Sequence, residues 1–84
     1  MTELDVLYFA WVRERIGVAK EQVTTDARTV EALISELSKR EERYQLAFQD
    51  MAVVKVAIDQ TLVPLDASLD GAKEIAFFPP MTGG

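Results

Sequence analysis

The chemistry in this sequence is concentrated in its last residues, which read FFPPMTGG. Histidine and cysteine are absent, so thiolate nucleophiles, Cys/His zinc sites, iron–sulfur ligation and the usual general base near neutral pH are excluded. Carboxylates, hydroxyls, lysines and the chain end remain. Gly83 and Gly84 have no side chains, so a narrow channel can admit them and a reagent can approach the terminal carboxylate. We therefore expect the carboxylate of Gly84 to be the reactive group.

The residues before the glycines suit the presentation of that carboxylate. Pro79 and Pro80 cannot donate to a strand ladder, so they end the last strand and favour an extended exit. The segment 79–84 has a reach of about 20 Å, enough to enter a pocket in another protein, with Met81 and Thr82 available for contacts. A carboxylate is a poor electrophile and must be activated, most economically as an acyl-adenylate, before a sulfur or nitrogen nucleophile can attack it.

Composition limits the remaining classes of function. The 84 residues suit one domain, and a net charge of −5 disfavours a nucleic-acid partner. The apolar runs are too short to span a bilayer, and the start MTELDVLYFA carries acids where a signal peptide carries lysines. We expect a cytoplasmic protein with no bound metal or cofactor, and one that performs no catalysis by itself.

The positioning elements follow from hydrophobic periodicity. Leu4–Trp11 is predicted to be a strand with Leu4, Val6, Tyr8 and Ala10 on one face, and KEQVTT a second strand in a hairpin with it. Between them, VRERIG predicts one or two helical turns ended by Gly17. MAVVKVAID, QTLVPL and KEIAFF predict three further strands, with turns around Asp59–Gln60 and Leu69–Gly71.

One long helix is predicted from about Val30 to Tyr44. Its apolar residues recur at helical spacing, Thr29 suits the N-cap, and Glu31 suits the helix dipole. The charged segment 39–43 belongs on its solvent side. Glu41 and Glu42 are not expected to form a catalytic pair, because adjacent helical residues point about 100° apart.

This element order favours an α+β fold, a β-grasp roll in which one long helix covers one face of a mixed sheet of four to five strands. Residues 1–78 would form the domain and 79–84 the tail. If Ile75 and Phe77 point toward the helix, Ala76 and Phe78 point away from it, and the same parity places Leu7 and Phe9 outside. Phe9 and Phe78, with Leu62 nearby, would form an exposed docking patch unless loops cover them.

The chain resembles the small, sulfur-carrying subunit of molybdopterin synthase, a ubiquitin-like family. The resemblance rests on YFAWVRERIG, TVEALISEL, AIDQTLV and, most specifically, LDGAKEIAFFPPMTGG. The family pattern would have an asparagine-like residue at Asp59 and an acidic residue near Lys73, so this chain departs from it at both positions.

The resemblance implies a specific chemistry. In that family an adenylyltransferase of the ubiquitin-activating type, using ATP and magnesium, activates the terminal glycine, which becomes a thiocarboxylate and gives its sulfur to cyclic pyranopterin monophosphate. By resemblance, Gly84 carries the sulfur and Gly83 and Thr82 line the threaded tail. Phe9, Leu62 and Phe78 would contact the large synthase subunit, in an assembly of two small and two large subunits. Two alternatives remain. The first is a different carrier of the same fold, such as the sulfur carrier of thiamine synthesis or a protein-modifier tag. The second is a non-covalent ubiquitin-like interaction domain.

Overall fold

The computed structural model describes residues 2–49 and 54–80. Eight elements follow one another along these residues: β1 (Thr2–Tyr8), α1 (Ala10–Ile16), β2 (Lys20–Thr25), α2 (Val30–Arg40), α3 (Glu42–Phe48), β3 (Lys55–Ile58), β4 (Thr61–Val63) and β5 (Glu74–Phe78). The predicted hairpin, the terminal strand and the strands on either side of Asp59–Gln60 are therefore present.

The strands form one five-stranded mixed sheet in the order β2-β1-β5-β3-β4. The first and last strands are central neighbours and run parallel, with Val6 opposite Ile75 and Tyr8 opposite Phe77. The other three pairs are antiparallel. This is the topology of the β-grasp roll that the element order predicts.

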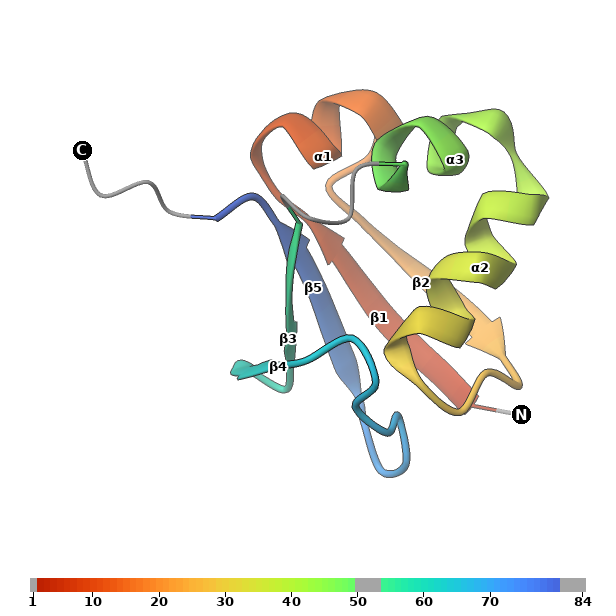
Figure 1. Cartoon of the computed structure of the whole chain (residues 1–84), viewed down its shortest axis with the longest axis vertical. Coiled ribbons are helices and arrows are strands. Elements are labelled where there is room, and N and C mark those ends of the chain that lie inside the picture. The colour runs from red at the N-terminus through yellow and green to blue at the C-terminus, as the bar shows by residue number, and fades with distance from the viewer. Residues whose placement is uncertain (1, 50–53, 81–84) are drawn as a thin grey trace.

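The helices lie over one face of the sheet, and the core fills the space between them (Figure 1). Leu4, Val6 and Tyr8 point into this core from β1, and Ile75 and Phe77 from β5, each 1% exposed or less. At about 25 cal/mol per Å² of apolar surface removed from water, burial of these strand faces is the main term that holds the helices on the sheet. The inward parity predicted for both central strands is confirmed.

The first strand is shorter than predicted. It ends at Tyr8 rather than at Trp11, and Ala10, expected to point inward, is exposed. Phe9 keeps an extended backbone as the N-cap of α1, and Ala10 then takes a positive φ of 52° that turns the chain into the helix. Gly17 ends α1 in the left-handed conformation, φ 98°, as predicted.

The single long helix predicted from Val30 to Tyr44 is wrong. Glu41 has an extended backbone, φ −149° and ψ 150°, and separates α2 from α3, so the described residues contain three helices. The break lets Arg43 donate to the carbonyl of Ile16 at 2.9 Å and Tyr44 reach Glu21 on β2. These contacts, with burial of Ala47 and Phe48, offset the loss of helical continuity. The start is as predicted, because the Thr29 hydroxyl accepts from the backbone N–H of Ala32 at 3.2 Å.

Candidate functional site

The root of the tail lies at the end of a central strand. β5 ends at Phe78, and the half-buried Pro79 and Pro80 follow it without strand pairing. The predicted stop of the strand at the proline pair is therefore confirmed. The tail residues Met81, Thr82, Gly83 and Gly84 lie outside the described residues, so their predicted roles stay predictions.

The tail leaves beside the face of the sheet that the described helices do not cover (Figure 1). Alternation along β5 places Ala76 and Phe78 on this outer face, opposite the fully buried Ile75 and Phe77. The register continues the face onto β4, because Leu62 pairs with Ala57 and Ala57 pairs with Ala76. Leu62 is 65% exposed and Phe78 is half-buried. The structure thus places both side chains on one face.

Phe9 joins this region from a different position than predicted. It follows β1 instead of lying within it, and its backbone N–H donates to the carbonyl of Phe77 at 3.1 Å. Its side chain is 45% exposed. The hydrogen bond fixes Phe9 at the end of β5, so its backbone lies next to the strand from which the tail departs.

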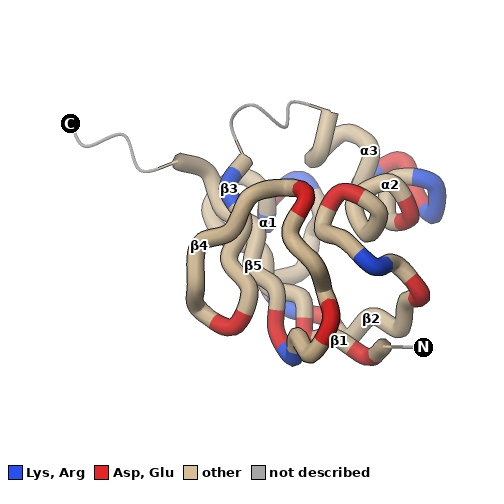
Figure 2. The backbone as a smooth tube through the Cα atoms, turned by 60° about the horizontal axis from the view of Figure 1, so that its bottom comes forward, with Lys and Arg blue, Asp and Glu red and all other residues tan. Residues whose placement is uncertain are grey.

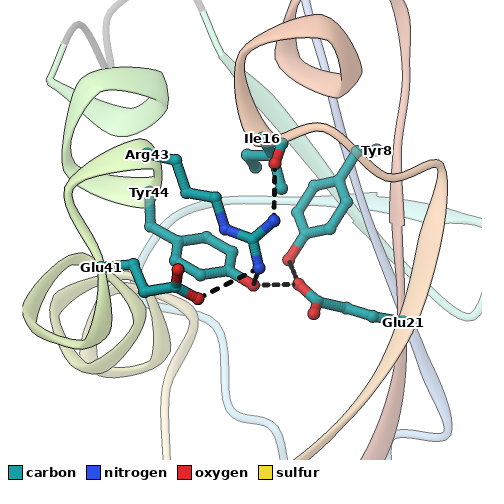
Figure 3. Close-up of polar contacts among 6 residues, drawn as sticks. All are labelled: Tyr8, Ile16, Glu21, Glu41, Arg43 and Tyr44. Carbon is teal, nitrogen blue, oxygen red and sulfur yellow. Dashed lines mark hydrogen bonds and ion pairs between the residues drawn. The ribbon is translucent and has the colours of Figure 1, made fainter.

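A polar cluster of side chains from β1, β2 and α3 lies between these elements (Figure 3). Glu21 on β2 accepts hydrogen bonds from the hydroxyl of Tyr8 at 2.7 Å and from that of Tyr44 on α3. Arg43 lies beside them, donating to the Tyr44 hydroxyl at 3.2 Å and to the Glu41 carboxylate at 3.1 Å. The cluster therefore ties β1, β2 and α3 together next to the residues that carry the tail.

Aromatic packing connects the cluster to β5. The Tyr8 ring stacks on that of Phe77 with centroids 6.1 Å apart, and Phe48 of α3 meets Phe77 edge-on at 4.9 Å. Phe77 is fully buried and directly precedes the outward-facing Phe78. Movement of α3 or Tyr8 would therefore be transmitted to the last residues of the strand.

Burial and the neighbouring carboxylate perturb both tyrosines. Burial and then the hydrogen bond and negative charge of Glu21 raise the pKa of Tyr44 to about 12. The same causes, in the same order, raise the pKa of Tyr8 further. Both hydroxyls thus remain un-ionised donors at neutral pH. Their hydrogen bonds to Glu21 hold β1, β2 and α3 together.

Sequence reasoning missed Glu21, although a signal was present. In KEQVTT, the residues Glu21, Val23 and Thr25 share one strand face, and Val23 and Thr25 are buried in the structure. A carboxylate on an inward face needs hydrogen-bond donors, and the two tyrosines of the chain supply them. The tyrosine partners lie 13 and 23 residues away in sequence, which is why local patterns did not point to them.

The described residues include no group of three or more acidic side chains close enough to hold a metal ion. In the same residues no helix has the length and apolar character needed to cross a membrane. The candidate site is the outer face of the sheet, which carries Leu62 and Phe78 and has the root of the tail at one end.

Comparison with known proteins identifies this arrangement. The model of the ThiS family matches residues 6–84, which include the last residues of β1 and every later strand of the sheet. The chain belongs to the ThiS family. The predicted resemblance is also confirmed at the level of individual relatives.

This ThiS family chain is similar over nearly its whole length to molybdopterin synthase sulfur carrier subunits. The subunit from Haemophilus influenzae is 44% identical over 96% of this chain and 99% of the relative. The subunit from Escherichia coli is 43% identical over the same shares. The expected relationship to sulfur carriers of molybdopterin synthase is therefore shown.

Solved structures agree with the fold of this ThiS family member. A putative molybdopterin converting factor subunit 1 from Pyrococcus furiosus superposes with a TM-score of 0.73 at 26% identity, covering 96% of this chain and 100% of the other. A complex of subunits 1 and 2 of molybdopterin-converting factor from Helicobacter pylori contains a chain with a TM-score of 0.63 at 22% identity, covering 99% and 100%. At that identity the second likeness supports the fold alone.

Proposed function

We propose that this chain is the sulfur carrier of a molybdopterin synthase and that Gly84 bears the sulfur. The observation that carries the proposal is the match to named sulfur carriers over 96% of the chain, in a family model that extends through residue 84. The geometry adds support, since a proline-ended central strand places the tail root beside an outer face with exposed apolar side chains.

The proposed chemistry is an activation followed by two transfers. A carboxylate oxygen of Gly84 attacks the α-phosphorus of ATP, which carries magnesium in the activating enzyme, and diphosphate leaves. Sulfide then attacks the acyl carbon of the adenylate and AMP leaves, which gives a thiocarboxylate without any change of oxidation state. The thiocarboxylate sulfur finally bonds to a carbon of cyclic pyranopterin monophosphate as an oxygen leaving group departs from that carbon, which gives a thioester. Water then cleaves the bond between the acyl carbon and the sulfur, so that each carrier leaves one sulfur atom for the dithiolene and returns as a carboxylate.

The partners follow from this division of labour. The chain has no histidine or cysteine to act as base or nucleophile, so the activating enzyme and the large synthase subunit would supply those groups. The relatives at 43–44% identity are named as subunits of molybdopterin synthase, and in the Helicobacter pylori complex subunit 1 of the converting factor is bound to subunit 2, so we propose a large-subunit partner for this chain as well. We propose that Phe9, Leu62 and Phe78 contact these partners, that Pro79–Gly83 form the threaded stalk, and that two carriers assemble with two large subunits in the cytoplasm.

Intact-mass measurement tests the proposal directly. The chain is co-expressed with an adenylyltransferase of the ubiquitin-activating type and a sulfur source, and its mass is compared with that of the chain expressed alone. We expect a form heavier by the difference between one sulfur and one oxygen atom, with fragmentation placing the change on Gly84.

Deletion of Gly84 supplies the matched control. We expect the shortened chain to keep the same thermal unfolding but to lose sulfur transfer when mixed with the large subunit and the activating enzyme. Retained synthase activity in that chain would remove the covalent-carrier proposal. A thiamine-type pathway would be indicated instead if the loaded carrier delivered sulfur to a thiazole precursor and not to the pyranopterin.

A further inference from the structure

The uncovered face of the sheet is ordered in rows by the strand register. One row is apolar on four of its five strands: Leu7 on β1 lies opposite Ala76 on β5, Ala76 opposite Ala57 on β3, and Ala57 opposite Leu62 on β4. Phe78 lies two residues beyond Ala76 on the same face. The apolar surface therefore extends across the sheet and continues to the tail root.

Charges of opposite sign lie at the two ends of this face. Lys20 on β2 pairs with Leu7, and Lys55 on β3 pairs with Phe78, so both lysines flank the apolar row at or near the tail end. Asp5 pairs with Glu74 in the next row toward the other end, and Glu3 lies two residues further along β1. Figure 2 shows acidic segments around the start of β5 and the β3–β4 turn, where Lys73 also lies near Asp5 and Glu74.

The acidic end is not organised as a cation site. The described residues hold no group of three or more acidic side chains that could bind a metal. Asp59, the acidic residue at the β3–β4 turn, accepts hydrogen bonds from the backbone N–H groups of Lys73 and Glu74 at 3.2 and 2.9 Å. The other acidic residues are spread along two neighbouring strands, with Glu3 and Asp5 on β1 and Glu74 on β5. This spacing is typical of a protein-binding surface.

The charges decide among the possible occupants of this face. A second copy of the chain would also carry a net charge of −5, so two copies repel each other on approach, as would a nucleic acid. The face would be complemented by a protein surface that has an apolar patch in the middle, basic side chains opposite Asp5 and acidic side chains opposite Lys55. Building on the proposed function, we propose that this charge polarity sets the orientation in which the carrier docks on the large synthase subunit.

Orientation matters because the tail leaves from only one end of the face. An apolar row alone allows the partner to bind in two orientations related by a half-turn, and only one of them aims the tail at the partner's pocket. Successive outward residues on a strand are about 7 Å apart, close to the Debye length of about 8 Å at physiological ionic strength. The charges therefore act at contact range, where wrong pairing disfavours the reversed orientation.

Charge-reversal variants test this proposal against the purified large subunit from the same organism. Asp5→Lys and Lys55→Glu each reverse one end, and together they cancel in net charge while inverting the polarity. Glu14→Lys on α1 is the matched control, because it changes net charge as Asp5→Lys does but lies on an exposed helix position. Glu3→Lys replaces Asp5→Lys if the latter fails to fold.

We expect each single reversal on the face to weaken the complex by about three- to tenfold at low salt and the double variant by more than tenfold. Glu14→Lys should leave the affinity unchanged, and high salt should reduce all differences. Wild-type-like affinity in the double variant would mean that only net charge matters and would overturn the proposal. A wild-type homodimer that Asp5→Lys dissociates would overturn it by making the occupant a second copy. If the wild-type chain forms no complex at all, the proposed function fails and this inference fails with it.

Discussion

Glu21 illustrates how single residues determine where the tail root lies. Its carboxylate is shared by two tyrosines from different parts of the chain, and one of them, Tyr8, stacks on the buried Phe77 that precedes Phe78. Replacing a group that satisfies buried donors typically costs about 1–3 kcal/mol, because the remaining hydroxyls lose their partner. Glu21 lies on the inward face of β2 and contributes to the position of the strand ends through these contacts.

The cluster makes a prediction for alkaline pH. Tyr8 and Tyr44 are the only tyrosines, so the ultraviolet absorbance of tyrosinate reports on both. An ordinary tyrosine is half-ionised at pH 10.0, whereas Tyr44 should be half-ionised near pH 12. Tyr8 should not ionise at a lower pH than Tyr44 does. The pKa of Tyr44 is higher in the folded chain than in the unfolded chain. The contribution of this hydroxyl to the free energy of unfolding is therefore fully present below pH 10.0 and is lost as the pH rises through about 12.

Glu21→Gln is the control for this titration. It removes the negative charge and changes the hydrogen bonds, so both tyrosines should ionise at lower pH than in the parent chain, although burial should keep them above the ordinary value. Full ionisation of both tyrosines near pH 10.0 in the folded parent chain would show that the cluster does not form as described.

At the scale of elements, the turns and breaks decide how the helices and strands meet. The β3–β4 turn uses positive φ at both Asp59 and Gln60, 48° and 72°, the backbone of a type I′ hairpin turn. Aspartate is tolerated there and its carboxylate also anchors the start of β5 through Glu74. Asparagine, the residue typical of the family pattern, would keep that acceptor oxygen. Gln60 has no such compensation and adopts a conformation that favours glycine.

Gln60→Gly is therefore expected to stabilise the protein by about 0.5–1 kcal/mol, because glycine relieves the backbone strain at φ 72°. The free energy of unfolding from denaturant titration measures this effect. Gln45→Gly in α3 is the matched control and should destabilise by about 0.5–1 kcal/mol, since glycine weakens a helix interior. Equal losses in both variants would contradict the assigned turn geometry.

At the scale of the whole molecule, the sheet separates two surfaces with different tasks. The helix-covered face builds the core, and the other face, next to the root of the tail, is the one that we propose meets a protein partner (Figure 1). Three large apolar side chains of the described residues are exposed, and Phe9 and Leu62 lie near this region whereas Leu46 lies on α3. A comparison of Leu62 with Leu46 can therefore show whether the location of an exposed leucine, and not its exposure alone, affects binding of a partner.

Leu62→Ala should weaken the complex with the large subunit by about 1–3 kcal/mol, while Leu46→Ala should leave the affinity unchanged. Both side chains are about half exposed or more, so neither change should alter the fold greatly. Isothermal titration with the purified large subunit measures both affinities. Equal affinities for Leu62→Ala and the parent chain would exclude Leu62 from the interface.

Local patterns in the sequence determined most of the architecture. Alternation along β1 and β5 predicted their buried faces, Gly17 and Thr29 predicted helix ends, and Pro79–Pro80 predicted the end of the last strand. The buried strand faces, the helix ends and the end of the last strand depend on the backbone and on neighbours a few residues away. They can therefore be predicted from the sequence without knowledge of the tertiary structure. The identity of the family followed from the same local segments.

Only the tertiary structure decided where β1 stops, why the helix breaks at Glu41 and which residues share the outer face. The helix break depends on Arg43 and Tyr44 reaching groups 27 and 23 residues away, and the helical periodicity of the segment carries no trace of those contacts. Likewise, the pairing of Leu7 with Ala76 and of Ala57 with Leu62 is a property of strand register. Register is set by the whole sheet, because moving one strand by a residue reverses every side chain on it.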